Sequence, residues 1–350
     1  MTPHLEVTDP GAATSIQDLG RVGLQRYGVP VSGALDPVAL RLANALVGAP
    51  DGAAGLEIRY LGPTLRALGG PIRVALAGGL AEMRVARVDG GEEMVGAGRS
   101  LTLHPGDTLR VGPLRGKSAT AILACSGGVA TAPMLGSRAT FARSGLGGLD
   151  GRDLRPGDRI PVGSAAGSGP ERALADTDEP HWSGVARVVL GPQEDYFTEE
   201  AIARLLSTSW RVSKNADRMG LRLVAPDDDE GLRLEHSGGH DIVSDGIVTG
   251  AIQVPGSGLP ILLLVDRQAS GGYPKIATVA SVDLPAVGRL RAGDSLRFEA
   301  VSADVAAGFR RRAEAEIRAA IARIGDWSPA GLNLDALYAG NLISAPIDDL

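Results

Sequence analysis

Polar and charged side chains gather between residues 240 and 275, where they flank or interrupt two apolar runs. The runs, residues 247–254 and 259–265, are short, rich in branched residues and separated by Pro255-Gly256-Ser257-Gly258. This pattern predicts two buried strands joined by a tight turn. Strand ends are rigid places from which side chains can be directed into a cleft. The polar residues at these ends are Ser244, Asp245, Gln253, Asp266, Arg267 and Gln268. A binding site and a hairpin with polar ends are the two interpretations of this stretch.

A glycine-rich segment follows directly, with the sequence Ser270-Gly271-Gly272-Tyr273-Pro274-Lys275. Adjacent glycines let backbone N–H groups approach a ligand closely. Pro274 restricts its own φ and biases Tyr273 towards an extended backbone, which gives the neighbouring side chains a repeatable direction. Lys275 could therefore offer a compact positive charge to a phosphate or a carboxylate. The alternative is a surface lysine at the start of a strand over residues 276–279.

A second polar stretch lies near the N-terminus, after a short strand expected at residues 5–7. It is long, punctuated by glycine and without helical or strand periodicity, and long loops of this kind are often functional. Its polar residues are Gln17, Asp18, Arg21, Gln25, Arg26, Ser32 and Asp36. We predict that residues 14–36 and 244–275 line one cleft between two halves of the molecule.

Mainly short strands are expected to position these residues. From residue 55 to 129, apolar segments alternate with turn residues, which is typical of small closed or sandwich-like β structures. Asp36 and Pro37 predict the start of a helix, and Thr198 predicts the start of another. Apolar residues recur at four-residue spacing over residues 302–324, which predicts a long C-terminal helix.

Composition shifts divide the chain into parts. A stretch rich in small and polar residues predicts a linker at residues 166–182. It separates an N-terminal half, residues 1–165, from a C-terminal half, residues 183–325. Residues 326–350 show no clear period, and we expect a loosely attached tail there.

Overall composition excludes some classes of protein. The net charge of −6 over 350 residues argues against a general nucleic-acid binder. The single cysteine, Cys125, excludes an intrachain disulfide, and its apolar surroundings predict a buried structural thiol. The sequence contains no run of about eighteen apolar residues, so we expect no membrane-spanning helix. The N-terminus does not resemble a secretory signal, so we expect a cytoplasmic protein.

Familiar cofactor motifs are incomplete. Residues 112–118 resemble a nucleotide-binding loop, but the spacing between the glycines is one residue short and the following segment predicts a strand. His236, His240 and Asp241 have glycines between them and no further strong ligand close by, so we expect no metal site. A Met-Lys-Met-type attachment site for biotin is absent from the sequence, and any biotin would be carried on another chain.

Three longer motifs resemble one protein family. They are SIQDLGRVGLQRYGVPVSGALDPVALRLAN from residue 15, KNADRMGLRL from residue 214 and SDGIVTGAIQVPGSGLPILLLVDRQASGGYPKIATV from residue 244. Over roughly residues 5–300 the chain is similar to the C subunits of 5-oxoprolinases, also described as allophanate hydrolase subunit 2 or the biotin-dependent carboxyltransferase-like family. Two departures are Asp245, where the family more often has Glu, and Ala269-Ser270 in place of a Thr pair.

The resemblance implies a mainly β fold of two cyclophilin-like β-barrel halves, with a few short helices and one C-terminal helix. It implies a hetero-oligomer with two further proteins, a B-type (kinase-inhibitor-type) subunit of 5-oxoprolinase and an A-type one. Such a complex uses ATP as co-substrate to open the lactam of 5-oxoproline, giving glutamate, ADP and phosphate. The alternatives are a biotin-dependent carboxyltransferase acting on urea or a similar small amide, and a non-catalytic regulator acting through a B-type partner.

The chain holds residues suited to such chemistry. Asp245 or Asp266 could act as acid or base, and Lys275 and Arg218 could stabilise developing negative charge. Glutamine amides could orient an amide or ureido group. The catalytic candidates are therefore Asp245, Asp266 and Lys275. The substrate-binding candidates are Gln17, Ser32, Asp36, Arg218, Ser244, Gln253, Gln268, Gly271, Gly272 and Tyr273.

Overall fold

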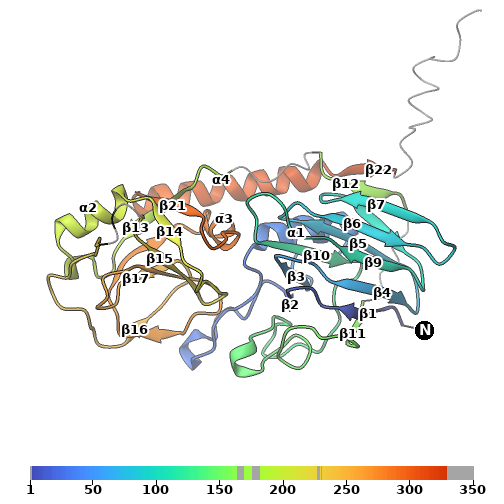
Figure 1. Cartoon of the computed structure of the whole chain (residues 1–350), viewed down its shortest axis with the longest axis horizontal. Coiled ribbons are helices and arrows are strands. Elements are labelled where there is room, and N and C mark those ends of the chain that lie inside the picture. Colours follow the sequence, from blue (N-terminus) through green and yellow to red (C-terminus); the bar gives the residue numbers. More distant parts are fainter. Residues whose placement is uncertain (1, 164–168, 176–181, 227–228, 230, 329–350) are drawn as a thin grey trace, which may run out of the picture.

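Short strands with alternating buried and exposed residues build the N-terminal half, because the side chains of a strand point alternately to its two faces. In β6 (Glu82–Ala86), for example, Met83 and Val85 are buried. The computed structural model describes residues 2–163, 169–175, 182–226, 229 and 231–328. Within these ranges the chain forms two β units side by side, with a long helix across one face of both (Figure 1).

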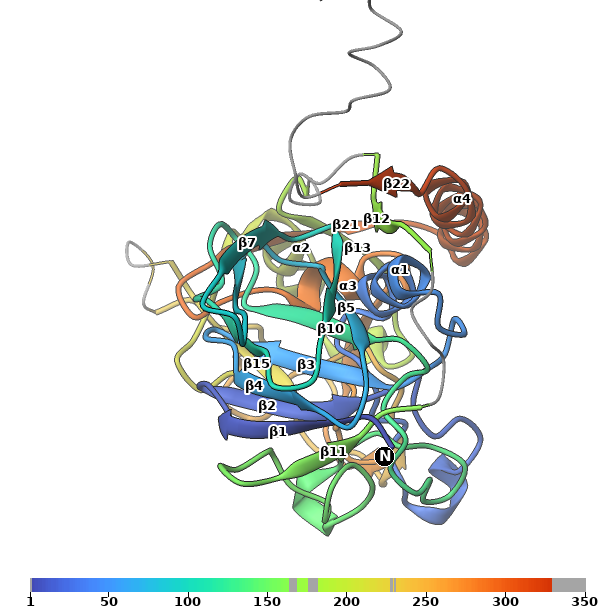
Figure 2. The same cartoon turned by 90° about the vertical axis from the view of Figure 1, so that its right-hand side faces the viewer.

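Two sheets make up the N-terminal unit. The six-stranded sheet has the order β11-β1-β4-β9-β6-β7, with β1 (His4–Asp9), β4 (Thr64–Leu68), β7 (Glu92–Gly96), β9 (Thr108–Val111) and β11 (Arg159–Pro161). The five-stranded sheet has the order β2-β3-β10-β5-β8, with β2 (Ala13–Gln17), β3 (Gly55–Arg59), β5 (Ile72–Ala77), β8 (Ser100–Leu103) and β10 (Thr120–Cys125). Every residue of β5 and β10 is buried, because the core fills one face of their sheet and helix α1 (Pro37–Val47) covers the other (Figure 2).

A closed barrel forms the C-terminal unit. Its strand order is β13-β20-β17-β18-β15-β14-β21. The bounds are β13 (Val185–Leu190), β14 (Trp210–Val212), β15 (Gly220–Val224), β17 (Ala251–Gln253), β18 (Ile261–Leu263), β20 (Lys275–Val279) and β21 (Ser295–Ala300). The predicted hairpin is confirmed, since β17 and β18 pair antiparallel, although both strands are shorter than the apolar runs. Beside the barrel, β16 (Asp245–Gly246) pairs with β19 (Ser270–Gly271).

The prediction of a mainly β fold with few helices and one C-terminal helix is confirmed. Among the described residues only the C-terminal unit closes into a barrel, whereas the N-terminal unit is divided between its two sheets. In the N-terminal core, Cys125 is a buried structural thiol as predicted, and burial raises its pKa to about 12. No helix in the described ranges is long and apolar enough to cross a bilayer.

The helices begin where the sequence predicts. Asp36 caps α1 by accepting a hydrogen bond from the backbone N–H of Ala39, and Thr198 caps α2 (Glu199–Ser207) in the same way. Ser302 caps the long C-terminal helix α4 (Ala303–Ala322). The short elements are α3 (Leu284–Gly288) and the 3-10 turns η1 (Gln25–Tyr27), η2 (Ala142–Ser144) and η3 (Glu194–Tyr196).

Helix α4 joins the two units although little of it is buried. Along α4, all of which the structure describes, Ile317 is the one buried residue, and Val305 of the expected apolar face is 48% exposed. On the barrel side, the Arg187 guanidinium carbon lies 4.0 Å from the ring centroid of Phe309. On the other side, Arg41 of α1 donates to Glu314 at 2.8 Å. Contacts at these positions therefore hold α4 across both units (Figure 1).

Two stretches predicted to lack regular structure contain strands. Residues 171–173 of the expected linker form β12 (Glu171–Ala173), which pairs antiparallel with β22 (Gly325–Trp327). The expected tail therefore begins within a strand that returns to the N-terminal unit. Residues 164–168, 176–181 and 329–350, which include other parts of the expected linker and most of the tail, lie outside the described residues.

Candidate functional site

A lysine and a carboxylate meet at the end of the barrel that carries the β17–β18 turn. Lys275, the first residue of β20, pairs with Gln253, the last residue of β17, at a local shift of register. The Lys275 side chain is only 3% exposed, whereas that of Asp245 is 52% exposed. The Lys275 Nζ donates to Asp245 Oδ2 at 2.7 Å. Lys275 is therefore a buried side chain, which excludes the alternative of a surface lysine.

Gln193 forms hydrogen bonds with both residues of this pair. Its Nε2 donates to Asp245 Oδ2 at 3.1 Å, and its Oε1 accepts from the backbone N–H of Lys275 at 3.1 Å. The hydrogen bonds from Lys275, from the Gly246 N–H and from Gln193 hold the pKa of Asp245 below its ordinary value. The ionised carboxylate of Asp245 thus lies in direct contact with the Lys275 side chain, and both are groups that can take part in general acid–base chemistry.

The sequence analysis did not single out Gln193. The contact joins positions 82 residues apart, and nothing in the surrounding Gly191-Pro192-Gln193-Glu194 distinguishes this glutamine from a surface residue.

Two predicted glutamines, Gln253 and Gln268, lie close to Gly271, the residue that pairs with Asp245 between β19 and β16. A Cβ atom at Gly271 would lie 3.0 Å from Gln253 Nε2 and 3.5 Å from Gln268 Nε2, so both amides lie close to the backbone at this glycine. Gln253 is buried and donates to the Tyr273 carbonyl at 3.3 Å, whereas Gln268 is exposed. Two amide groups close together can orient an amide substrate through its N–H and C=O groups.

The other predicted substrate-binding residues of this segment, Ser244, Gly272 and Tyr273, lie close to Asp245 in the chain or through Gly271. The Gly272 carbonyl accepts from the Ile242 N–H at 2.8 Å, which fixes the chain that leads to Asp245. Ser244 is exposed, and a Cβ atom at Gly272 would lie 3.9 Å from its Oγ. Tyr273 is 42% exposed.

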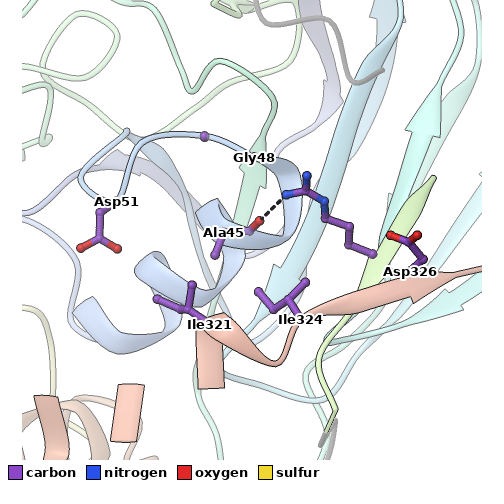
Figure 3. A pocket seen from close by; sticks show the side chains of 8 residues that line it. Ala45, Gly48, Asp51, Ile321, Ile324 and Asp326 are labelled. Carbon is purple, nitrogen blue, oxygen red and sulfur yellow. Dashed lines mark hydrogen bonds between the residues drawn. The ribbon is translucent and has the colours of Figure 1, made fainter. Parts of the chain in front are cut away.

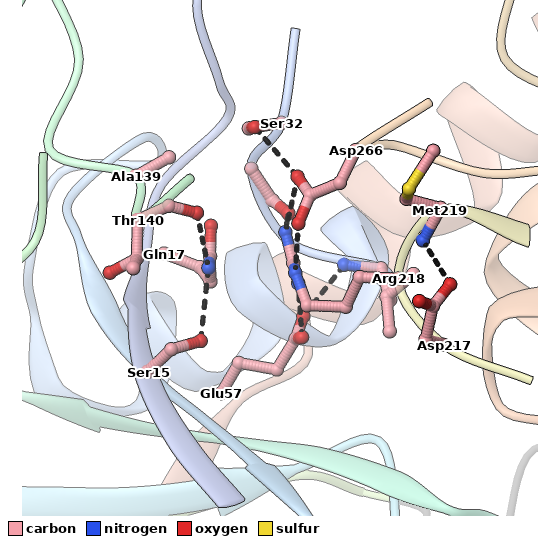
Figure 4. Close-up of polar contacts among 12 residues, drawn as sticks. Ser15, Gln17, Ser32, Glu57, Ala139, Thr140, Asp217, Arg218, Met219 and Asp266 are labelled. Atoms are coloured by element: carbon pink, nitrogen blue, oxygen red, sulfur yellow. Dashed lines mark hydrogen bonds and ion pairs between the residues drawn. The ribbon is translucent and has the colours of Figure 1, made fainter. Parts of the chain in front are cut away.

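A second polar cluster lies where the barrel meets the N-terminal unit (Figure 4). Asp266 accepts a hydrogen bond from Ser32 Oγ at 2.6 Å and one from Arg218 Nε at 2.8 Å. Arg218 Nη1 donates to Glu57 of β3, and Arg218 Nη2 donates to the Gly33 carbonyl at 2.7 Å. Although burial opposes its charge, Glu57 and Asp266 raise the pKa of the Arg218 guanidinium above its ordinary value.

This junction cluster, defined as Ser32, Glu57, Arg218 and Asp266, fixes residues 32–35 between the two units. Ser32 N–H donates to the Val265 carbonyl at 3.0 Å, and Leu35 N–H donates to Glu57 Oε2 at 2.7 Å. Every guanidinium nitrogen of Arg218 already has an acceptor in the protein. We therefore interpret Arg218 as a positioning residue, rather than as the stabiliser of developing charge suggested by its sequence motif.

Gln17 and Asp36 are engaged elsewhere. Gln17 is buried in the N-terminal unit, where its Nε2 donates to Ser15 Oγ at 3.0 Å and to the Thr140 carbonyl at 3.2 Å (Figure 4). Asp36 caps α1 through Oδ1 and accepts from Arg289 at 2.6 Å through Oδ2. Gln17 and Asp36 thus lie apart from the group formed at the barrel by Asp245, Gln253, Gln268, Gly271 and Lys275.

Within the described residues, no group of at least three His, Cys, Asp or Glu side chains is arranged to hold a metal ion. His236 binds the Val254 carbonyl through a ring nitrogen at 2.9 Å, and His240 contacts Asp241 at 3.2 Å.

A separate pocket lies between α1, the end of α4 and β22 (Figure 3). It has a volume of about 510 Å³ and is lined by Ala45, Gly48, Ala49, Asp51, Arg172, Ile321, Ile324 and Asp326. Arg172 donates to the Ala45 carbonyl at 3.3 Å on its wall. None of the residues predicted to bind substrate lines this pocket.

Two β units joined by a buried ion-pair cluster, with a polar site on the barrel unit, define a two-subdomain β protein. The chain belongs to the carboxyltransferase family: the family described as "Carboxyltransferase domain, subdomain A and B" matches residues 27–300. The family resemblance inferred from the three motifs is thereby confirmed.

Subunits of 5-oxoprolinases and urea amidolyases are both among the similar proteins. The C subunit of the 5-oxoprolinase of Escherichia coli strain K12 is 33% identical over 84% of this chain and 90% of its own length. The urea amidolyase of Lachancea kluyveri is 33% identical over 89% of this chain, which corresponds to 18% of that longer protein. Among solved structures, the K. lactis urea amidolyase aligns with a TM-score of 0.79 and 28% identity, over 96% of this chain and 21% of its own.

Proposed function

We propose that this chain is the C subunit of an ATP-dependent 5-oxoprolinase, which converts 5-oxoproline, ATP and water to glutamate, ADP and phosphate. The observation that carries the proposal is the contact between Lys275, Asp245 and Gln193 beside two glutamine amides. The similarity to the E. coli protein, over 90% of that protein's length, supports it. A-type and B-type partner proteins would complete a cytoplasmic hetero-oligomer.

The barrel site offers a division of roles. Gln253 and Gln268 orient the lactam through its N–H and C=O groups. The Lys275 ammonium stabilises the negative charge that develops on the lactam oxygen, and its burial strengthens this interaction. Asp245, which is ionised at neutral pH as aspartates ordinarily are, accepts a proton from the attacking water. ATP, bound to the assembled enzyme, supplies the activation of the lactam.

A carboxyltransferase acting on urea or a similar small amide is the second candidate. The structural similarity to the K. lactis urea amidolyase over 96% of this chain favours it. In that reaction another chain would carry biotin, and the same lysine and amides would hold the ureido group.

Reconstitution tests the proposal. The chain is co-expressed with its A-type and B-type partners, and glutamate and phosphate are measured with 5-oxoproline and ATP. The proposal predicts equal amounts of both products, and it predicts no turnover when this chain is left out. Carboxylation of urea in the presence of a biotin-carrying partner would instead favour the second candidate. Stable partner binding without turnover of any small amide would identify a regulator.

A further inference from the structure

Arg267 is a buried cation with few partners. Its side chain is among the largest of those that are fully buried, at 1% exposure. Nη2 donates to the Ile247 carbonyl at 3.1 Å, while Nε and Nη1 have no hydrogen-bond partner among the residues that the structure describes. Burial also lowers the pKa of Arg267 to about 10. A buried charge is costly unless it is paired, so this arrangement calls for an explanation.

The neighbouring cations, unlike Arg267, contact carboxylates. Lys275 contacts Asp245, and Arg218 contacts both Glu57 and Asp266. Asp266 precedes Arg267 in the chain, but its carboxylate is bound by Arg218 and Ser32. In the part of the chain that the structure describes, no ion pair joins Arg267 to an acidic residue. The guanidinium of Arg267 is therefore a positive charge that the surrounding protein does not neutralise.

Ile247 connects Arg267 to the two glutamine amides. Its carbonyl accepts from Arg267 and, at 3.1 Å, from Gln25 Nε2. Its Cδ1 lies 2.8 Å from the position of a Cβ atom at Gly271, which is the same position that Gln253 and Gln268 approach. Ile247 thus lies between Arg267 and the place where the proposed substrate amide is held.

We propose that Arg267 binds a carboxylate of the substrate, so that this site takes small amides or lactams that carry a carboxylate in preference to neutral ones. The proposal rests on the proposed function for the position of the amide group. Nε and Nη1 are shielded from solvent, so the carboxylate must displace a neighbouring group. We expect Gln25 to be the group that moves, because it donates to the same Ile247 carbonyl as Arg267 and comes from the turn η1, which has no buried residue.

Equilibrium binding to the assembled complex without ATP tests this inference. The probes are 5-oxoproline and 2-pyrrolidinone, which share the lactam ring and differ by the carboxylate. We expect the native complex to bind 5-oxoproline roughly 10- to 100-fold more tightly, the range for a hydrogen bond to a charged group. Arg267→Met should bring the two affinities within about threefold of each other and leave that for 2-pyrrolidinone unchanged. Arg222→Met, which removes an exposed arginine from the same barrel, is the matched control and should keep the preference.

Folding of each variant is checked by circular dichroism and by partner binding. If Arg267→Met does not assemble, Arg267→Lys serves instead, because it keeps the charge but not the fork of donors and should weaken the preference about tenfold. A folded Arg267→Met complex that retains the full preference would overturn the inference, as would equal binding of both probes by the native complex. If 5-oxoproline is not hydrolysed but the preference disappears in Arg267→Met, the proposed function fails and the carboxylate site stands.

Discussion

Burial of the Lys275 side chain fixes the direction in which its charged end points. Its side chain is 3% exposed, yet its ammonium reaches a carboxylate that is 52% exposed, so the charge is directed from the barrel wall to the surface of the site. Under the proposed function Lys275 meets developing negative charge mainly in the transition state, and Lys275→Ala should then lower kcat and kcat/KM together by roughly 10²–10³. Steady-state kinetics of the reconstituted complex measure this effect.

Lys214→Ala is the matched control, because Lys214 is exposed and lies outside the site. The control variant should keep native kinetics. Native kcat in a correctly assembled Lys275→Ala complex would remove Lys275 from the proposed chemistry.

The contact with Lys275 also fixes the direction of a pH effect. Lys275 is the largest cause of the lowered pKa of Asp245, because a nearby cation favours the ionised carboxylate. Replacing the cation by a neutral side chain must therefore raise that pKa. We expect Lys275→Gln to move the titration of Asp245 upward, towards about 3.9, the ordinary value for aspartate. NMR titration of the Asp245 side-chain carboxyl carbon measures the shift, and an unchanged or lower midpoint would contradict it.

Among the elements, α4 relies on charged contacts more than on burial. Glu314 is 27% exposed, and Arg41, followed by Arg318, lowers its pKa to about 2 from an ordinary value of 4.5. A carboxylate with a lowered pKa stabilises the fold above the pKa of the unfolded chain, and this contribution is lost as the pH falls through the folded value. The window for Glu314 is therefore between about pH 4.5 and about pH 2.

Glu314→Gln should accordingly lower the free energy of unfolding at pH 7 by about 1 kcal/mol, near the upper end for partly exposed ion pairs. Urea titrations at pH 7 and pH 3 provide the comparison, and the difference between variant and native protein should shrink at the lower pH. Glu316→Gln, on an exposed position of the same helix, should have no such effect. A destabilisation that is independent of pH would show that Glu314 acts by packing alone.

Local signals in the sequence were sufficient for individual elements. Asp36 and Thr198 mark helix starts because their side chains satisfy N–H groups a few residues away, and Pro255–Gly258 marks a hairpin because the turn is local. The division of the N-terminal strands between two sheets had no such signal. Strand β12 also had no local signal, because its partner β22 lies more than 150 residues further along the chain. Ala173, for example, pairs with Gly325.

The candidate site shows the same limit. Lys275, Asp245, Gln253 and Gln268 share one segment whose glycines and strand ends point to a site, so sequence alone placed them together. Gln193 and Glu57 come from distant parts of the chain and resemble ordinary strand or loop residues. Arg218 and Asp36 are part of a motif, yet only the geometry shows that their polar groups are occupied by other protein groups.

For the molecule as a whole, the junction cluster holds the two units together. Arg218→Met would leave Glu57, whose side chain is 1% exposed, and Asp266 buried without their cation. Removing one partner of a buried ion pair typically costs about 3–5 kcal/mol, so we expect a loss of stability of that size. Thermal or urea unfolding measures it.

The double variant Arg218→Met/Glu57→Gln should recover part of this loss, because it also removes one of the stranded carboxylates. Two separate unfolding transitions in Arg218→Met would show that the units then unfold independently. A stability equal to that of the native protein would mean that the cluster contributes no net stability.

The pairing of β12 with β22 has a topological consequence. Ala173 and Gly325 face each other at the end of an antiparallel pair, as do the two residues that flank a hairpin turn. Everything between them, residues 174–324, takes the place of a hairpin loop, and the entire barrel and α4 lie within it. In evolutionary terms the C-terminal unit resembles a cassette inserted between two paired strands of the N-terminal unit. A short turn in its place would close the N-terminal unit without changing the order of its strands, so the two units could have been gained, lost or exchanged separately.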